Sequence, residues 1–452
     1  MPAPLIPSFS EGIFLLNFAF GYARIKTHDK KKGLTMSFFD YLKERGYVYQ
    51  ATNEAEIKKS IDGDKPITFY FGIDPTADSL HIGHFFALMM FRLLQRQGHH
   101  GILVIGGATA LVGDPTGKSD MRKMMTKETV AHNVEEVKNL AKRFIKTDGD
   151  NPALILDNSE WINQYTYVDF LRLVGTHFNV AKMLASEAYS KRLENGGLTF
   201  LEMGYMLMQA YDFVYLNRKY GCTLEIGGSD QWGNIVAGTE LSRKMNIHDE
   251  GKTHDDRPDT FGLTCPLLMT KEGKKMGKTE AGTLWVARDK TVPYTFYQYF
   301  YNTDDADTGK LLKAFTDIPT AEIDAMCKND IVAAKRRMAY EVTKLVHGEE
   351  EANKAVEAAK ALFAKGTDMS DVPTAELSKS VLEQGIGILD LAVKVGFIPS
   401  KGEARRLIQQ GGFSLNGKRI SAPEQQVTLA DTDKDALLLQ KGKKNFLRVV
   451  VK

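Results

Sequence analysis

The chain has 452 residues, 43% of them hydrophobic and 26% charged, and its formal net charge is +2. This length exceeds that of a single typical domain, while the composition is ordinary for a soluble globular protein. Its three cysteines, Cys222, Cys265 and Cys327, are far apart and show no metal-ligand spacing. We therefore expect two or three domains, reduced thiols, a cytoplasmic location and no metal held by the protein itself.

Residues 1–35 form an extension that does not fit the pattern of the remaining chain. Its apolar segment at 13–20 is too short to span a membrane and has no basic region before it, and a basic stretch follows at 26–32. We interpret the extension as an upstream start or a disordered tail, with an organelle transit peptide as the alternative. No membrane partner is expected.

A strand followed by a helix is predicted near residue 80. The alternating aromatic and β-branched residues at 68–73 indicate a buried strand. The apolar run that comes next predicts a helix that Asp78 or Ser79 can cap and that Gly98 can end.

Two histidines open this helix and make it a candidate phosphate site. His81 and His84 lie three residues apart on one face of the first turn, where free backbone amides and the helix dipole favour anions. Gly83 has no side chain, so a flat base can approach the backbone closely. The alternative is a helix start with two surface histidines.

A polar stripe within an apolar helix forms a second candidate site. Tyr205, Gln209 and Asp212 fall at positions i, i+4 and i+7 and so share one face, with methionine and leucine residues around them. These apolar neighbours favour a buried pocket wall over the alternative, a stripe that faces solvent.

Asp230 and Gln231 follow a predicted strand at 223–226 and the pair Gly227-Gly228. This order predicts a second strand end at the carboxyl edge of a parallel sheet, where ligands bind. Asp230 is suited to ribose hydroxyls, and the alternative is that it only caps the next helix.

A short basic loop lies downstream. Lys274, Lys275 and Lys278 stand beside Gly273 and Gly277, so mobile ammonium groups can close over a triphosphate and stabilise developing charge. The alternative is a solvated surface loop. An earlier glycine-containing segment, 113–118, lacks the spacing of a Walker phosphate loop, and we expect it to form a pocket wall.

Together these segments resemble the class I aminoacyl-tRNA synthetases, which carry a His-Ile-Gly-His signature and a Lys-Met-Ser-Lys-Ser-like loop. The two motifs here are His81-Ile82-Gly83-His84 and Lys275-Met276-Gly277-Lys278-Thr279, with Gly277 in place of the first serine and Thr279 in place of the last. The resemblance narrows to the bacterial-type tyrosyl-tRNA synthetases through the blocks 72–80, 106–118, 205–212 and 225–234. It extends from about Met36 to the C-terminus.

The resemblance implies an enzyme that joins L-tyrosine to tRNA(Tyr) by way of tyrosyl-adenylate, with ATP as a substrate that carries Mg²⁺. It implies catalytic roles for Thr76, His81, His84, Lys275, Lys278 and Thr279. It implies that tyrosine is bound by Tyr70, Asp114, Tyr205, Gln209, Asp212 and Gln231. It implies that ATP is bound by Asp74, Gly83, His84, Gly228, Asp230 and Lys278, and that Lys118 and Arg122 lie near pyrophosphate. Among these, Tyr70 and Asp212 are expected at the substrate hydroxyl.

One position departs from the bacterial pattern. Phe71 stands where many relatives carry a cysteine that touches the ribose, and a phenyl ring cannot make that hydrogen bond. We assign no ribose role to Phe71. The resemblance also implies a homodimer. We expect the segment from Trp161 to Phe178, which contains apolar and aromatic residues, to form the contact between the two subunits.

The expected fold is α/β with three parts. A Rossmann-like parallel-sheet catalytic domain at 36–290 carries the dimerisation insertion, an α-helical anticodon-side domain follows at 291–375, and a small α+β RNA-binding module occupies 383–452. Amphipathic patterns predict the helical domain from about Pro293.

The last module is basic. It holds twelve Lys or Arg against seven Asp or Glu, a surplus that favours phosphate backbones. Its segment 400–418 resembles a helix-hairpin module of a ribosomal protein, which implies RNA contacts by Lys401, Arg405, Arg406 and Lys418. A merely solvated basic tail is the alternative.

Two other functions fit parts of the sequence. An adenylyltransferase of the same sheet type shares a His-x-Gly-His element but lacks the tyrosine-matching helix and the RNA module. An RNA-binding or splicing-assisting protein with a vestigial site would not need the charged catalytic residues, all of which are present here. Tyrosine-dependent pyrophosphate exchange separates the three.

Overall fold

The computed structural model describes residues 36–116, 124–194, 196–248, 259–271, 273–279, 282–361, 373–432, 436–442 and 445–452. At Lys278 and Thr279 it describes the backbone alone. The extension 1–35, Lys118 and Arg122 lie outside the described residues, so the predictions made for them stay predictions.

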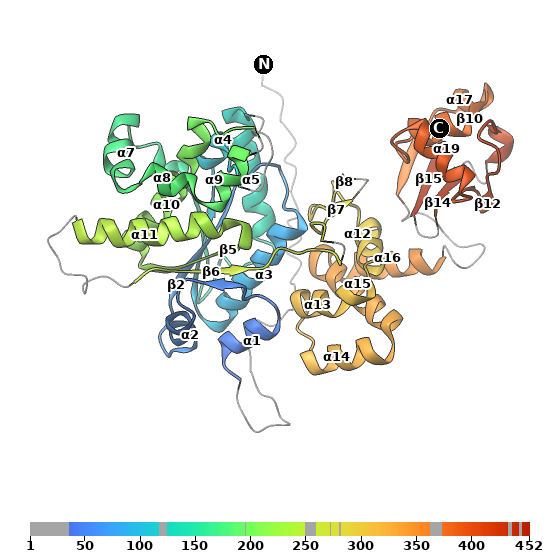
Figure 1. Ribbon diagram of the computed structural model, residues 1–452. Coiled ribbons are helices and arrows are strands. Elements are labelled where there is room, and N and C mark those ends of the chain that lie inside the picture. The colour runs from blue at the N-terminus through green and yellow to red at the C-terminus, as the bar shows by residue number, and fades with distance from the viewer. Residues whose placement is uncertain are drawn as a thin grey trace, which may run out of the picture.

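A six-stranded sheet of order β1-β6-β5-β2-β3-β4 forms the centre of the first part of the chain (Figure 1). Its strands are β1 (Gln50–Ala51), β2 (Thr68–Ile73), β3 (His100–Ile105), β4 (Leu154–Asp157), β5 (Cys222–Gly228) and β6 (Phe261–Cys265). Strands β2 to β6 are parallel to their neighbours, whereas β1 pairs antiparallel with β6. The parallel sheet confirms the expected α/β class, and β2 has the predicted bounds.

Helices cover both faces of this sheet, because side chains alternate in direction along each strand. Phe69 and Phe71 of β2 join a core with α1 (Phe38–Glu44), α2 (Glu54–Asp62), α3 (Ile82–Gln97) and α5 (Lys127–Ala141). Tyr70, between them, faces the opposite core, which contains α10 (Phe200–Tyr220) and α11 (Trp232–His248). The sequence therefore directs one β2 side chain towards the polar face of α10.

The chain order of the strands creates a ligand-binding position. From β2 the chain proceeds outward through β3 and β4, and it then returns to place β5 and β6 on the other side of β2. The carboxyl ends of β2 and β5 therefore lie side by side at a topological switch point, where open α/β sheets bind ligands. The 3₁₀ turn η2 (Ser229–Gln231) and the short α4 (Thr109–Val112) stand at this edge.

Four short helices and a 3₁₀ turn lie between β4 and α10: α6 (Ser159–Ile162), α7 (Tyr167–Leu173), η1 (Gly175–His177), α8 (Val180–Leu184) and α9 (Glu187–Glu194). The proposed dimer contact begins in this region, but Trp161 is only 1% exposed. Trp161 was therefore wrongly placed in a surface contact. Tyr167 and Val168 of α7 are 64% and 61% exposed, so within residues 161–178 the exposed large apolar side chains lie on α7.

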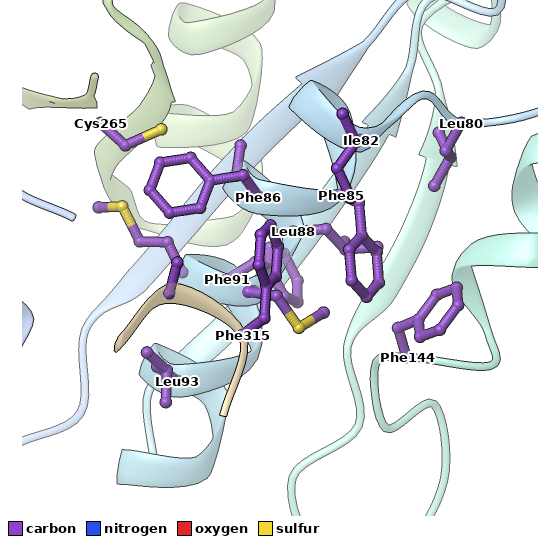
Figure 2. Packing of buried hydrophobic residues seen from close by; sticks show 14 of the residues in the cluster. Leu80, Ile82, Phe85, Phe86, Leu88, Phe91, Leu93, Phe144, Cys265 and Phe315 are labelled. Atoms are coloured by element: carbon purple, nitrogen blue, oxygen red, sulfur yellow. The ribbon is translucent and has the colours of Figure 1, made fainter. Parts of the chain in front are cut away.

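The helical part consists of α12 (Pro293–Tyr301), α13 (Asp305–Phe315), α14 (Thr320–Asn329), α15 (Ile331–His347) and α16 (Glu349–Ala361). It begins at the proline expected from the sequence and packs on α3 through a shared core, as Figure 2 shows for Phe315 beside Phe85 and Phe86. The Phe85 and Phe315 rings stack with centroids 5.7 Å apart. Arg45 also donates hydrogen bonds to the carbonyl oxygens of Lys313 and Ile318, at 2.7 and 2.6 Å.

The C-terminal part has its own sheet of order β12-β11-β14-β15-β9 and its own apolar core. Its elements are β9 (Thr374–Leu377), α17 (Lys379–Glu383), β10 (Ile386–Gly387), α18 (Ile388–Lys394), α19 (Lys401–Gln409), β11 (Phe413–Leu415), β12 (Lys418–Arg419), β13 (Gln426–Val427), η3 (Leu429–Asp431), β14 (Ala436–Lys441) and β15 (Asn445–Val451). Because β9 pairs in parallel with β15, this unit begins by residue 374 and not at 383 as expected. None of the described helices is both long enough and apolar enough to cross a membrane.

Candidate active site

A cavity of about 500 Å³ lies at the switch point. It is bounded by the ends of β2 and β5, the first turn of α3, the polar face of α10 and the segment 275–277. Fourteen of the candidate residues line it, namely Tyr70, Asp74, Thr76, His81, Gly83, His84, Asp114, Tyr205, Gln209, Asp212, Gly228, Asp230, Gln231 and Lys275. Segments more than two hundred residues apart therefore converge on one space.

The two histidines occupy the start of α3 in a way that the sequence did not predict. His81 itself is the N-cap, and its Nδ1 accepts hydrogen bonds from the backbone N–H groups of Gly83 and His84, both at 3.1 Å. The amides expected to be free are thus already bonded, and neither Asp78 nor Ser79 caps the helix. Since Nδ1 is an acceptor, the neutral His81 ring carries its proton on Nε2. The His81 and His84 rings stack with centroids 3.6 Å apart.

The lysine loop packs directly on the histidine helix. Gly277 has a φ of +82°, and a Cβ atom added there would lie 2.4 Å from Cγ2 of Ile82, so only glycine fits both the backbone and the contact. Next to it, the Lys275 ammonium forms an ion pair with Asp230 at 3.4 Å. The loop ends in the two-residue strands β7 (Lys278–Thr279) and β8 (Gly282–Thr283).

Tyr299 of α12 fixes this loop from the helical part. The Gly277 N–H donates a hydrogen bond of 2.7 Å to the Tyr299 hydroxyl. A few residues earlier, the Lys271 N–H donates to Oδ2 of buried Asp307 in α13, at 3.2 Å. The loop that carries Lys275 is therefore held by two helices outside the sheet.

Asp212 is held rigidly at the wall of the cavity. It is 4% exposed, and it accepts hydrogen bonds from Trp161 Nε1 at 2.7 Å and from Asn158 Nδ2 at 3.0 Å. Burial raises the pKa of this carboxyl to about 8, against the lowering effect of the two hydrogen bonds. A carboxyl with fixed orientation suits recognition of a substrate hydroxyl.

Two further carboxylates are engaged in polar networks. Asp74 accepts hydrogen bonds from the hydroxyls of Tyr205 at 3.0 Å and Thr109 at 2.7 Å. Asp114 accepts from Nε2 of Gln231 at 2.7 Å and from the backbone N–H of Thr116 at 3.0 Å. These carboxylates give the cavity the negative charge that an ammonium group requires.

Four residues of the site were not identified from the sequence: Asn158, Trp161, Glu225 and Tyr299. Asn158 and Trp161 stand three residues apart directly after the end of β4, and this position is the only local signal that could have indicated them. Glu225 interrupts an apolar strand, and a charged residue in a buried strand is a usable signal. Phe71 is buried and lines the cavity, so the departure noted above lies within the site.

The candidate RNA residues lie in the C-terminal part. Lys401, Arg405 and Arg406 are exposed on α19, and Lys418 is exposed on β12. Within the described residues, no group of three or more His, Cys, Asp or Glu side chains could hold a metal ion.

Comparisons with known proteins agree with this geometry. Residues 62–364 match the family model for class I tRNA synthetases (W and Y), and residues 364–449 match the model for the C-terminal domain of tyrosine–tRNA ligases. The tyrosine–tRNA ligase of Clostridium tetani is 50% identical over 91% of this chain and 98% of its own length. That of Acetivibrio thermocellus is 49% identical over 91% of this chain and 99% of its own length.

Solved structures show the same fold. A C-terminally truncated mitochondrial tyrosyl-tRNA synthetase of Aspergillus nidulans has a TM-score of 0.64 and 28% identity, over 74% of this chain and 96% of its own. The corresponding Coccidioides posadasii structure has a TM-score of 0.61 and 30% identity, over 72% of this chain and 93% of its own. Both family models and the curated relatives therefore show that the chain belongs to the class I tRNA synthetases, in the tyrosine–tRNA ligase family.

Proposed function

We propose that the cavity is where this family member activates L-tyrosine with ATP, before the tyrosyl group is transferred to the 3′ end of tRNA(Tyr). The observation that carries the proposal is the convergence of a carboxylate-lined amino-acid end with a histidine and lysine end in one cavity. In the first step the tyrosine carboxylate attacks the α-phosphate and pyrophosphate leaves. In the second step the terminal ribose of the tRNA attacks the activated carbonyl.

No side chain needs to act as a nucleophile in this scheme. His81, His84 and Lys275, together with Thr76, Lys278 and Thr279, are proposed to bind the charged transition state better than ground-state ATP. Lys118 and Arg122 are proposed to lie near pyrophosphate. Mg²⁺ is proposed to arrive with ATP as part of the substrate.

The substrate amino acid is proposed to lie between α10 and the ends of β2 and β5. Its ammonium would be held by Tyr205, Gln209 and Asp114, and its hydroxyl by Tyr70 and Asp212. Asp230, Gly228, Gly83 and Asp74 would bind the nucleotide, and Gln231 would contact the carboxylate. The hydrogen bond between Asp114 and Gln231 supports the placement of the amino acid, because it preorganises two of its binding groups, and the hydrogen bond between Tyr205 and Asp74 joins the amino-acid and nucleotide ends.

Docking of tRNA is assigned to the basic C-terminal part, through Lys401, Arg405, Arg406 and Lys418. We divide the chain into the extension 1–35, a catalytic part to about 290, a helical anticodon-side part from 291 and the C-terminal RNA-binding part. A homodimer and a cytoplasmic location complete the proposal. The exposed apolar side chains of α7 are consistent with the dimer.

Tyrosine-dependent exchange of pyrophosphate into ATP tests the activation step. We expect the full chain to catalyse this exchange, and we expect Lys275→Ala to slow it by about ten- to a hundredfold, the value of a hydrogen bond to a charged group. Tyrosine affinity should stay nearly unchanged, because Lys275 lies at the nucleotide end of the cavity.

Lys274→Ala is the matched control. Lys274 is an exposed neighbour in the same loop but does not line the cavity, so its loss should leave exchange close to the wild-type rate. Absence of tyrosine-dependent exchange in the wild type would overturn the proposed function. Equal losses in both variants would remove Lys275 from its role.

A further inference from the structure

A buried glutamate beside the tyrosine end of the cavity has no role in the mechanism above. Glu225 of β5 is 2% exposed and lines the cavity. Its Oε1 accepts a hydrogen bond from Nε2 of Gln209 at 3.0 Å, whereas its Oε2 forms no hydrogen bond of proper geometry to any described residue. An incompletely bonded carboxyl group in a buried strand is costly, so it is expected to serve a purpose.

Glu225 lies directly beside the residue expected to read the substrate hydroxyl. It is the register partner of Tyr70 in the parallel pair of β5 and β2. The Tyr70 hydroxyl is itself buried and, like Glu225 Oε2, lacks a hydrogen bond of proper geometry to any described residue. A hydrogen-bond interaction with the Tyr70 hydroxyl nevertheless lowers the pKa of Glu225 and raises that of Tyr70, so the two groups lie within reach of each other. The hydroxyl proton of Tyr70 therefore has an acceptor within reach in the protein itself, namely the carboxyl group of Glu225.

The surroundings of Glu225 are acidic or neutral. Burial raises its pKa to about 7, and no described cation is among the groups that shift it. The other titratable groups around it are Tyr70 on β2, Asp212 on α10 and Cys222 on β5. From α11, Gly238 faces Oε2, and a Cβ atom there would lie 3.3 Å away. The carboxyl thus changes charge near neutral pH without a cation to compensate it.

Resting on the function proposed above, we infer that Glu225 is a positioning residue for tyrosine recognition, which acts by controlling where the Tyr70 hydroxyl donates its proton. The Tyr70 hydroxyl can donate one hydrogen bond. When Glu225 is neutral, Tyr70 donates to the hydroxyl of the substrate. When Glu225 is ionised, its carboxylate is the stronger acceptor and draws the Tyr70 proton away from the substrate.

The consequence is that preference for tyrosine over phenylalanine depends on pH. The carboxyl holds its proton below a pH of about 7 and loses it above that value. The ratio of kcat/KM for tyrosine to that for phenylalanine should therefore fall as the pH rises through about 7, before Asp212 loses its own proton near its pKa of about 8. The fall should be about two- to tenfold, the value of one neutral hydrogen bond. Phenylalanine has no hydroxyl, so it corrects for pH effects common to both substrates.

Glu225→Gln tests the inference by pyrophosphate exchange with each amino acid across this pH range. Glutamine keeps the size of the side chain and an acceptor for Gln209 but cannot ionise. We expect the pH-dependent fall of the ratio to disappear in this variant, while the wild type and Tyr70→Phe are measured beside it. A wild-type ratio that is flat with pH would overturn the inference, even if Glu225→Gln failed to fold.

The Tyr70→Phe background separates positioning from a merely structural effect. If Glu225 acts through the Tyr70 hydroxyl, Glu225→Gln should leave the ratio unchanged once that hydroxyl is absent. An equal effect of Glu225→Gln in both backgrounds would contradict the inference and point to action through Asp212. Because wild-type exchange with tyrosine is measured in the same series, failure of the inference is distinguishable from failure of the proposed function.

Discussion

Tyr299→Phe is the most specific test of how the helical part supports the chemistry. The substitution removes one oxygen atom, the acceptor of the 2.7 Å hydrogen bond from the Gly277 N–H. Tyr299 does not line the cavity, so it cannot contact tyrosine or ATP there. Its effect should therefore come only from the position of the lysine loop.

The magnitude follows from a single hydrogen bond. Loss of this bond should weaken the observed loop position by about 0.5 to 1.5 kcal/mol, which corresponds to a two- to tenfold lower rate of adenylate formation. Gly277 would still pack on Ile82, so the loop should not be lost altogether. Pyrophosphate exchange at saturating tyrosine should show the lower kcat, and equilibrium binding should show an unchanged Kd for tyrosine.

Tyr294→Phe provides the matched control on the same helix. The Tyr294 hydroxyl is buried and interacts with Gln298 of its own helix, without a hydrogen bond of proper geometry to any described residue, so its removal should not slow exchange. If Tyr299→Phe exchanged pyrophosphate at the wild-type rate, the loop would not depend on α12. If both variants lost activity equally, general loss of helix packing would explain the result.

Three further outcomes are expected. Tyr70→Phe should lower kcat/KM for tyrosine about two- to tenfold and affect phenylalanine less; an unchanged ratio in pyrophosphate exchange would remove Tyr70 from the specificity site. A chain that ends at residue 364, where the two family regions meet, should keep pyrophosphate exchange but lose most tRNA charging, and full charging would contradict the RNA-docking assignment. Asp212 and Glu225 have pKa values of about 8 and 7 in the folded state, above their ordinary values of 3.8 and 4.5. The folded state therefore binds more protons than the unfolded state, so the free energy of unfolding should decrease as the pH rises from about 4 to about 8. Urea unfolding should show a smaller loss in Glu225→Gln, and identical pH profiles would refute the shifted glutamate pKa.

Regular periodicity explains what could be predicted from the sequence. The strand at 68–73 and the shared face of Tyr205, Gln209 and Asp212 depend on repeats of two and 3.6 residues, which are local properties of the chain. The order of five parallel strands then brings their ends together, so these residues meet with the histidines in one cavity.

The cap of α3 shows what local pattern cannot decide. Asp78 and Ser79 are good capping residues, but Asp78 forms an ion pair with Lys290 at 2.8 Å, and the Ser79 hydroxyl accepts a hydrogen bond from the Ala287 N–H at 3.2 Å. Both partners lie about two hundred residues downstream, so they are invisible to local sequence rules. His81 therefore caps the helix instead of Asp78 or Ser79.

Long-range support of the site was missed for the same reason. Trp161 of α6 and Asn158, the residue before α6, donate hydrogen bonds to Asp212. Tyr299 of α12 accepts a hydrogen bond from the Gly277 N–H. Each interaction joins elements that are separate in sequence and carries no periodic signal. Glu225 is visible in the sequence as a charge within an apolar strand, but its pairing with Tyr70 depends on strand register.

Charging of tRNA with each amino acid in turn tests the central claim most directly. The full chain would be incubated with ATP, Mg²⁺ and tRNA that includes tRNA(Tyr), and aminoacyl-tRNA would be quantified for every amino acid. We predict that tyrosine alone is attached at a substantial rate, because phenylalanine has no hydroxyl to pair with the buried Tyr70 hydroxyl, which lacks a hydrogen bond of proper geometry to any described residue. Absence of tyrosyl-tRNA, or charging of phenylalanine as fast as tyrosine, would contradict the account.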